Sequence, residues 1–244
     1  MPRLDELVCE RGLAPSRSQA RHLILSGRVS NPETGNVLHK PGKNLPHDAP
    51  LAVAEGPSYV SRAGEKLAGA LEHFKIEPAG LCVLDLGAST GGFTDCVLQR
   101  GASHVTCVDV GHGQLHPSLA GDERVVNLEG RNVRDLAAIG LPHPAYPLIV
   151  MDLSFISLAH ALGPAWERLH PGGHLIALVK PQFEVTPALA ARYKGIIRDP
   201  AEHNRVLRDA RMRAARLPGA SVLGHCESPI QGADGNREFL LAVR

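Results

Sequence analysis

A glycine-rich stretch decides the fold of the longer part of the chain: Asp85-Leu86-Gly87-Ala88-Ser89-Thr90-Gly91-Gly92-Phe93. It directly follows an apolar run, residues 82–86, and precedes a helical run that contains Val97 and Leu98. Glycines at such a junction allow a tight turn from strand to helix and let a ligand approach the backbone closely. The stretch is therefore a candidate ligand-binding turn, although a plain strand-to-helix connection would look similar.

Short apolar runs separated by helical lengths follow this turn along the chain. This pattern is typical of buried parallel strands in an α/β sheet. The predicted strands are residues 82–86, 104–109, 148–152 and 174–180, and residues 222–225 and 239–243 supply a closing pair. Asp85, Asp109 and Asp152 lie in or beside the ends of three strands, and Lys180 ends the fourth. Ligands of open α/β sheets bind at the carboxyl ends of strands, so these polar residues mark the predicted site.

Asp109 narrows the choice of ligand. It lies about 20 residues beyond the glycines, the spacing at which an acid accepts hydrogen bonds from the ribose hydroxyls of an adenosine. Dinucleotides and S-adenosylmethionine share that requirement. Ala88 and Ser89 stand where a pyrophosphate-binding turn has its second glycine, so the order G-x-G-x-x-G is absent. The turn therefore favours S-adenosylmethionine over NAD.

Four charged residues far apart in the sequence form a second candidate group: Lys66, Asp152, Lys180 and Glu238. Lys66 belongs to a predicted helix that has Ser61 as its N-cap and is ended by Pro78 and Gly80. Lys180 follows apolar residues in a predicted central strand, where a lysine must find partners or lose its charge. Asp152 and Glu238 are candidate partners, whereas each residue taken singly is also compatible with an ordinary surface charge.

The composition of the chain limits its partners, its cysteine chemistry and its location. The 244 residues carry 26 Lys plus Arg against 25 Asp plus Glu, so a polyanionic partner must be met by a local basic surface. Five scattered cysteines without a C-x-x-C pair predict free thiols, and no metal site is expected. Neither a signal peptide nor a long apolar segment is found, so we expect a cytoplasmic protein that does not enter membranes.

The first part of the chain is organised differently. Leu4, Leu7 and Val8 have helical spacing, and Ala20, Leu23 and Ile24 form the face of a second helix after Ser16. Five prolines between residues 31 and 57 then divide short runs that suit a small sheet. We predict a small α+β domain over residues 1–58 and an α/β domain over residues 59–244.

The complete set of motifs resembles the TlyA family, which consists of hemolysin-named relatives of FtsJ-type ribosomal RNA 2′-O-methyltransferases. The blocks that carry the resemblance are residues 59–67, 85–93, 108–111, 152–157, 180–184, 194–200 and 228–240. The resemblance implies a Rossmann-like S-adenosylmethionine-dependent methyltransferase sheet and a Lys-Asp-Lys-Glu catalytic tetrad at Lys66, Asp152, Lys180 and Glu238. We choose Lys180 as the base that accepts the ribose proton. The cofactor residues are expected to be Asp85, Gly87, Ala88, Ser89, Gly91, Gly92, Phe93 and Asp109.

The first domain resembles the RNA-binding domain named after small-subunit ribosomal protein four. Residues 3–5, 16–20, 27–29 and 40–42 carry this resemblance. It implies RNA contacts at Arg3, Arg17, Arg21 and Arg28, and ribosomal RNA or ribosomal subunits as partners. The family as a whole implies methylation of a cytidine ribose in 16S RNA, 23S RNA or both. Arg17 and Arg21 lie four residues apart and share a helix face, from which they could contact phosphates. The alternative is that this face is an ordinary solvated surface without an RNA partner.

Other functions are less consistent with the residues. A base methyltransferase would commonly have Asn or Asp followed by Pro-Pro where this chain has Asp152-Leu153-Ser154-Phe155. Methylation of a pyrimidine carbon would need a cysteine at a strand end, whereas Cys82, Cys96 and Cys107 lie in predicted core positions. A small-molecule O-methyltransferase would leave the first domain without a task. The remaining alternatives are a hemolysin-like protein and a non-catalytic RNA-binding factor of ribosome assembly.

Overall fold

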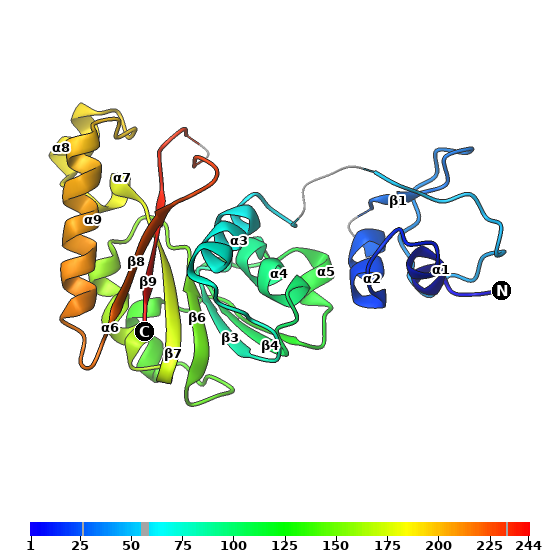
Figure 1. The fold of residues 1–244 in the computed structure, drawn as a ribbon, viewed down its shortest axis with the longest axis horizontal. Coiled ribbons are helices and arrows are strands. Elements are labelled where there is room, and N and C mark those ends of the chain that lie inside the picture. The colour runs from blue at the N-terminus through cyan, green and yellow to red at the C-terminus, as the bar shows by residue number, and fades with distance from the viewer. Residues whose placement is uncertain (26, 55–58, 233) are drawn as a thin grey trace. The chain divides into compact units, whose positions relative to one another are not determined.

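The computed structural model describes residues 1–25, 27–54, 59–232 and 234–244. The chain forms two compact units, Met1–Val60 and Ser61–Arg244, which are described separately (Figure 1). The predicted domain boundary after residue 58 lies outside the described residues.

The first unit pairs two helices with a two-stranded sheet. Its elements are α1 (Leu4–Glu10), α2 (Arg17–Leu25), β1 (Val29–Ser30) and β2 (Ala52–Val53), and β1 and β2 are antiparallel. The apolar faces predicted for the two helices meet in one core, where Leu4, Val8, Ala20 and Ile24 are fully buried. Gly12 lies shortly after the end of α1 and has a left-handed φ of 69°, a conformation that glycine adopts without strain.

The second unit is a mixed α/β sheet with short helices between its strands. Its strands are β3 (Cys82–Leu86), β4 (His104–Val108), β5 (Val125–Leu128), β6 (Tyr146–Met151), β7 (Leu169–Val179), β8 (Val222–Glu227) and β9 (Phe239–Val243). Its helices are α3 (Ala63–Phe74), α4 (Gly92–Gln99), α5 (Pro117–Ala120), η1 (Val133–Ala138), η2 (Leu158–His160), α6 (Leu162–Trp166), α7 (Pro181–Glu184), α8 (Pro187–Arg192) and α9 (Pro200–Ala215).

The strand order of the sheet is β5-β4-β3-β6-β7-β9-β8. The pairs from β5 to β7 are parallel, whereas β9 runs antiparallel between β7 and β8. The α/β sheet and its closing antiparallel pair are thus confirmed. Because the parallel strands share one direction, their carboxyl ends lie at one edge of the sheet.

Helices cover both faces of the sheet (Figure 1). Leu84 and Leu86 of β3 belong to a core cluster that includes Leu162 of α6 and Val206 of α9. Asp85 lies between these leucines and points to the opposite face, since side chains alternate along a strand. There it accepts a hydrogen bond from Thr94 of α4. The first turn of α4 is therefore fixed to the end of β3 from within the fold.

Two predicted elements have different bounds in the structure, and one strand of the structure was not predicted. The helix that carries Lys66 begins at Ala63, with Arg62 rather than Ser61 as its N-cap, and it ends before Lys75, whose φ is 56°. Strand β7 begins at Leu169 instead of residue 174. Its first half contains a Pro-Gly-Gly sequence, which is typical of a turn, so this part was not predicted as a strand. The edge strand β5 was not predicted; its sequence is Val-Val-Asn-Leu, and its residues are half-buried or exposed.

The sequence lacks a long apolar segment that could form a membrane-spanning helix. Among the residues that the structure describes, none of the helices is both long enough and apolar enough to span a bilayer.

Gly87 lets the end of β3 touch the end of β6. An added Cβ would lie 2.5 Å from the Asp152 carbonyl oxygen, and Gly87 has a φ of 84°. We expect Gly87→Ala to destabilise the second unit by about 3 kcal/mol, combining left-handed strain with an overlap against backbone. Denaturation followed by fluorescence of Trp166, the single tryptophan of the chain, measures this.

Gly80→Ala is the matched control for this prediction. Gly80 has a φ of 74°, but an added Cβ there would meet nothing within 4 Å. Gly80→Ala should lower the free energy of unfolding only by the cost of the left-handed backbone strain, about 1–2 kcal/mol. Equal losses in both variants would show that the contact between Gly87 and Asp152 does not constrain the fold.

Candidate active site

A hollow with a cavity volume of about 130 Å³ lies at the carboxyl edge of the sheet. Its described lining combines the glycine-rich turn with the start of α3 and with residues that follow β6 and β7. The lining residues are Ser61, Ala63, Gly87, Ala88, Ser89, Thr90, Gly92, Phe93, Asp152, Ser154 and Lys180. Five of the predicted cofactor residues and two of the predicted catalytic residues therefore share one pocket.

The start of α4 is in tight contact with the chain before α3. A Cβ on Gly92 would lie 2.3 Å from Ser61 Oγ and 2.9 Å from the Cβ of Ala63. Only glycine fits at this contact without a shift of the neighbouring atoms. The glycine therefore allows Ser61 and Ala63 to line the hollow.

Asp109 closes the opposite end of the glycine-rich turn. Its Oδ2 accepts a hydrogen bond of 2.8 Å from the Ser89 amide, and its Oδ1 accepts one of 2.7 Å from the Gly111 amide. A carboxylate oxygen has two lone pairs, so each oxygen can accept a further hydrogen bond. The carboxylate is therefore held in place and keeps acceptor capacity for the hydroxyl groups of a ligand.

Asp85 lies beneath the turn and is fully buried. Thr94 Oγ1 donates a hydrogen bond of 2.6 Å to its Oδ2, whereas its Oδ1 has no hydrogen-bond partner. Burial, helped by the nearby charges of Asp152 and Asp109, raises the pKa of Asp85 to about 7 against the opposing effect of the Thr94 bond. Among the described residues, none donates a hydrogen bond to this Oδ1 of Asp85.

The predicted tetrad forms two ion pairs. Lys66 Nζ lies 2.6 Å from Glu238 Oε2, and Lys180 Nζ lies 2.7 Å from Asp152 Oδ1. Lys180 also donates a hydrogen bond of 2.8 Å to Ser154 Oγ. Of the two partners suggested for Lys180, the structure confirms Asp152, while Glu238 instead pairs with Lys66. All four side chains are largely buried, which a charged group tolerates only when it is paired.

Strand register explains how these residues reach one edge of the sheet. Val179 pairs with Phe239, so Lys180 directly follows β7 where Glu238 directly precedes β9. Asp152 follows the last residue of β6, which is the neighbour of β7 on its other side. Lys66 comes from α3, one turn beyond the Ala63 that lines the hollow. Lys66 and Glu238 themselves are not part of the described lining.

Phe155 is a surface feature that sequence reasoning missed. It is 91 % exposed and has a left-handed φ of 63°, which is strained for a bulky residue. Its ring lies 5.1 Å from that of Phe183, next to the lining residue Ser154. Phe155 belongs to the sequence block of residues 152–157, but only the structure shows that its ring is exposed to solvent.

Glu184 anchors the loop that carries Phe155. Its carboxylate accepts hydrogen bonds of 2.8 Å from Ser157 Oγ and 2.7 Å from the Leu158 amide. Arg213 of α9 completes the contact with an ion pair of 3.0 Å. The loop between Asp152 and η2 is thus fixed at its far end.

One cysteine lies near Asp85, since Cys107 Sγ is 3.0 Å from the Thr94 hydroxyl that donates to this acid. Cys96 and Cys107 are buried, Cys82 is half-buried, and all five cysteines are free. The sequence interpretation of Cys96 and Cys107 as core thiols is therefore confirmed.

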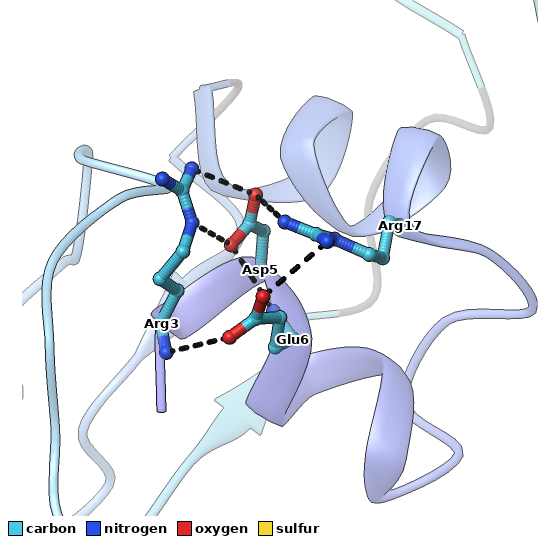
Figure 2. Close-up of polar contacts among 4 residues, drawn as sticks. All are labelled: Arg3, Asp5, Glu6 and Arg17. Atoms are coloured by element: carbon cyan, nitrogen blue, oxygen red, sulfur yellow. Dashed lines mark hydrogen bonds and ion pairs between the residues drawn. The ribbon is translucent and has the colours of Figure 1, made fainter. Parts of the chain in front are cut away.

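The arginines predicted to bind RNA have different surroundings in the first unit. Arg3 and Arg17 both contact Asp5, and Arg17 also contacts Glu6 (Figure 2). Arg21 is exposed on α2. Arg28 donates hydrogen bonds to the Ala54 carbonyl and so supports the small sheet.

Comparison with known proteins agrees with this geometry. Residues 59–244 match the model of the FtsJ-like methyltransferase family, which is more than half of the chain. The chain belongs to the FtsJ-like methyltransferase family. Residues 2–30 match the S4 domain, so this FtsJ-like methyltransferase carries an N-terminal S4 domain, as the TlyA resemblance predicted.

Relatives extend over nearly the whole of this FtsJ-like chain. The 16S/23S rRNA (cytidine-2′-O)-methyltransferase TlyA of Mycobacterium tuberculosis is 43% identical over 246 residues, covering 99% of this chain and 89% of that protein. Hemolysin A of Brachyspira hyodysenteriae is 38% identical over 240 residues, covering 98% of each. The solved structure of a candidate hemolysin from Streptococcus thermophilus superposes with a TM-score of 0.72 at 38% identity, covering 99% of this chain and 87% of that one.

Asp85 gives the second unit of this methyltransferase a distinct pH dependence. Below pH 7 the folded chain holds Asp85 protonated, whereas the unfolded chain releases this proton near pH 4, so raising the pH towards 7 removes stability. Asp85→Asn keeps an acceptor for Thr94 and cannot ionise. We expect its stability relative to the wild type to rise by on the order of 2–3 kcal/mol between pH 5 and pH 8.

Urea unfolding followed by Trp166 fluorescence, without added cofactor, measures this difference. Asp135→Asn, an exposed change of the same charge, is the control and should run parallel to the wild type. Parallel curves for Asp85→Asn would mean that Asp85 is ionised at no cost in the folded protein.

Proposed function

We propose that the chain is an S-adenosylmethionine-dependent ribosomal RNA 2′-O-methyltransferase that acts on a cytidine ribose in 16S RNA, 23S RNA or both. One observation carries the proposal: the Lys180–Asp152 ion pair opens into the same hollow as the glycine-rich turn. The named activity of the TlyA relative supports the choice of RNA and of nucleotide. In this proposal residues 1–58 bind RNA and residues 59–244 perform the transfer.

The residues of the hollow fit S-adenosylmethionine. Asp109 offers acceptors for ribose hydroxyls, Gly87 and Gly92 let the turn pack closely against Asp152 and Ser61, and Asp85 holds an unpaired oxygen beneath the turn. When bound, this cofactor supplies a methyl group that is already activated on a sulfonium. Asp85, Gly87, Ala88, Ser89, Gly91, Gly92, Phe93 and Asp109 are the proposed cofactor residues.

The tetrad has to align a ribose hydroxyl and remove its proton. Lys180 Nζ is the proposed base: once its ammonium group has released a proton to solvent, the free amine accepts the 2′-hydroxyl proton. Asp152 and Ser154 fix the direction of this amine through contacts of 2.7 and 2.8 Å. Lys66, held by Glu238, holds the ribose or its phosphate. Positioning of two reactants in line supplies a large part of such a rate enhancement.

Phe155 gives the target nucleotide a place to stack. RNA bases that are read outside a helix commonly lie on aromatic rings. An exposed ring in a strained backbone conformation, beside the pocket and tied down through Glu184, is suited to this task.

Methyl transfer from labelled S-adenosylmethionine to ribosomal subunits tests the main proposal. Lys180→Ala should lower the rate at least 100-fold, because general-base catalysis is worth 10²–10⁴-fold. Calorimetric binding of S-adenosylmethionine by this variant should stay within about threefold of the wild type. Mapping of ribose methylation identifies the labelled position.

Label on a base would contradict the 2′-O assignment. Unchanged transfer by Lys180→Ala would remove Lys180 from the chemistry. Cofactor binding by the wild type without transfer to either subunit would favour a non-catalytic assembly factor.

Phe155→Ala should raise the KM for the RNA substrate about tenfold, since stacking on an aromatic ring is worth about 1–3 kcal/mol per base. Cofactor affinity should not change. Leu223→Ala removes another exposed apolar side chain, on β8, and serves as the control. A loss of cofactor binding in Phe155→Ala, or an equal KM effect in the control, would contradict the stacking role.

A further inference from the structure

A buried acid lies between two arginines of the first unit. Asp5 is fully buried, and Arg3 Nε and Nη2 donate to its two oxygens at 3.0 and 3.1 Å (Figure 2). Arg17 Nη2 lies 3.4 Å from Asp5 Oδ2, and its Nη1 lies 3.3 Å from Glu6 Oε1. One carboxylate thus joins the segment before α1 to the start of α2.

The backbone fixes this acid independently of the arginines. The Glu6 amide donates a hydrogen bond of 3.1 Å to Asp5 Oδ1, and the Asp5 amide donates one of 3.0 Å to the Pro41 carbonyl. Burial alone would raise the pKa of Asp5, but the hydrogen bonds from Arg3 and Arg17 lower it below the ordinary value. Asp5 is therefore a charged anchor with a defined position.

Arg3 is held from a second side. A Cβ on Gly42 would lie 3.4 Å from Arg3 Nη2 and 3.5 Å from its Cζ, so the guanidinium group lies against the Gly42 backbone. An alanine there would press on the guanidinium. The plane of this group is thus fixed by Asp5 on one side and by the loop at Gly42 on another.

Both guanidinium groups still have donors for a ligand. The side chains of Arg3 and Arg17 are 45% and 55% exposed, although the acid between them is buried. A guanidinium has five N–H donors, and each arginine uses only two in these contacts. Such groups bind phosphate oxygens through paired, directed hydrogen bonds.

We propose that Asp5 is a positioning residue for RNA binding, which holds Arg3 and Arg17 as a preorganised pair that receives the phosphate backbone of the RNA. The proposal rests on the proposed function, because it assigns a device to the RNA-binding unit. Immobilising the two side chains before binding removes an ordering cost that the complex would otherwise bear. The arginines contact phosphates and therefore position the RNA without reading its sequence.

Charge and positioning predict opposite results for Asp5→Asn. Loss of a negative charge would by itself tighten binding to a polyanion. Loss of positioning should instead weaken binding about tenfold, the reverse of the charge effect. Glu10→Gln is the matched control, because Glu10 is an exposed acid on the same helix and makes the same change in charge. It should bind as tightly as the wild type or more tightly.

The experiment measures the affinity of the full chain for ribosomal subunits at several salt concentrations. Asp5→Asn is compared with the wild type, with Glu10→Gln, and with the same change in an Arg3→Ala/Arg17→Ala background. Asp5→Asn should weaken binding in the wild-type background and have no further effect in the double-alanine background, since it acts through the two arginines.

Three outcomes would overturn the proposal. Tighter or unchanged binding by Asp5→Asn would show that charge outweighs positioning. Equal weakening by Glu10→Gln would show a general effect of the helix. Weakening that persists in the double-alanine background would mean that Asp5 supports folding rather than the arginines. If the wild type itself fails to bind either subunit, the proposed function fails, and that result is distinct from these three.

Discussion

The close contact between Gly87 and the Asp152 carbonyl oxygen is the constraint on which the site depends. It is possible only without a side chain at position 87, since an added Cβ would lie 2.5 Å from that oxygen. This contact joins the carboxyl ends of β3 and β6, which carry the glycine-rich turn and the acid of the Lys180 pair. The glycine-rich turn and the Lys180–Asp152 pair therefore share one hollow.

Buried charge is the main cost of this arrangement, and the structure meets it in two ways. Lys66, Glu238, Asp152 and Lys180 are balanced as two pairs, so that each charge has an opposite charge within 2.7 Å. Asp85 lacks a cationic partner and has a pKa of about 7 instead. The difference follows from position, because Asp85 lies within β3 under the turn, whereas the paired residues lie at the ends of elements where long side chains can meet.

The sequence was sufficient to predict what depends on strand direction. Parallel strands place their carboxyl ends together, so the site at Asp85, Asp109, Asp152 and Lys180 could be predicted without coordinates. The sequence could not show that Glu238 pairs with Lys66 and not with Lys180, because the pairing depends on where α3 lies against β9. The exposure of Phe155 was missed because the residue types around it do not indicate it, and only the structure shows a side chain that is 91% exposed.

The same limit applies to the first unit, where counting charges gives a misleading result. Residues 1–58 hold nearly equal numbers of basic and acidic residues, which by itself argues against binding a polyanion. Yet Asp5 is fully buried while the arginines that it contacts are about half exposed, so the donors face solvent and the acid does not. The charge of the buried acid still opposes an approaching phosphate, but its hydrogen bonds give direction to the donors around it. The positions of the charges, which a count leaves out, therefore decide what a neutral composition presents to a partner.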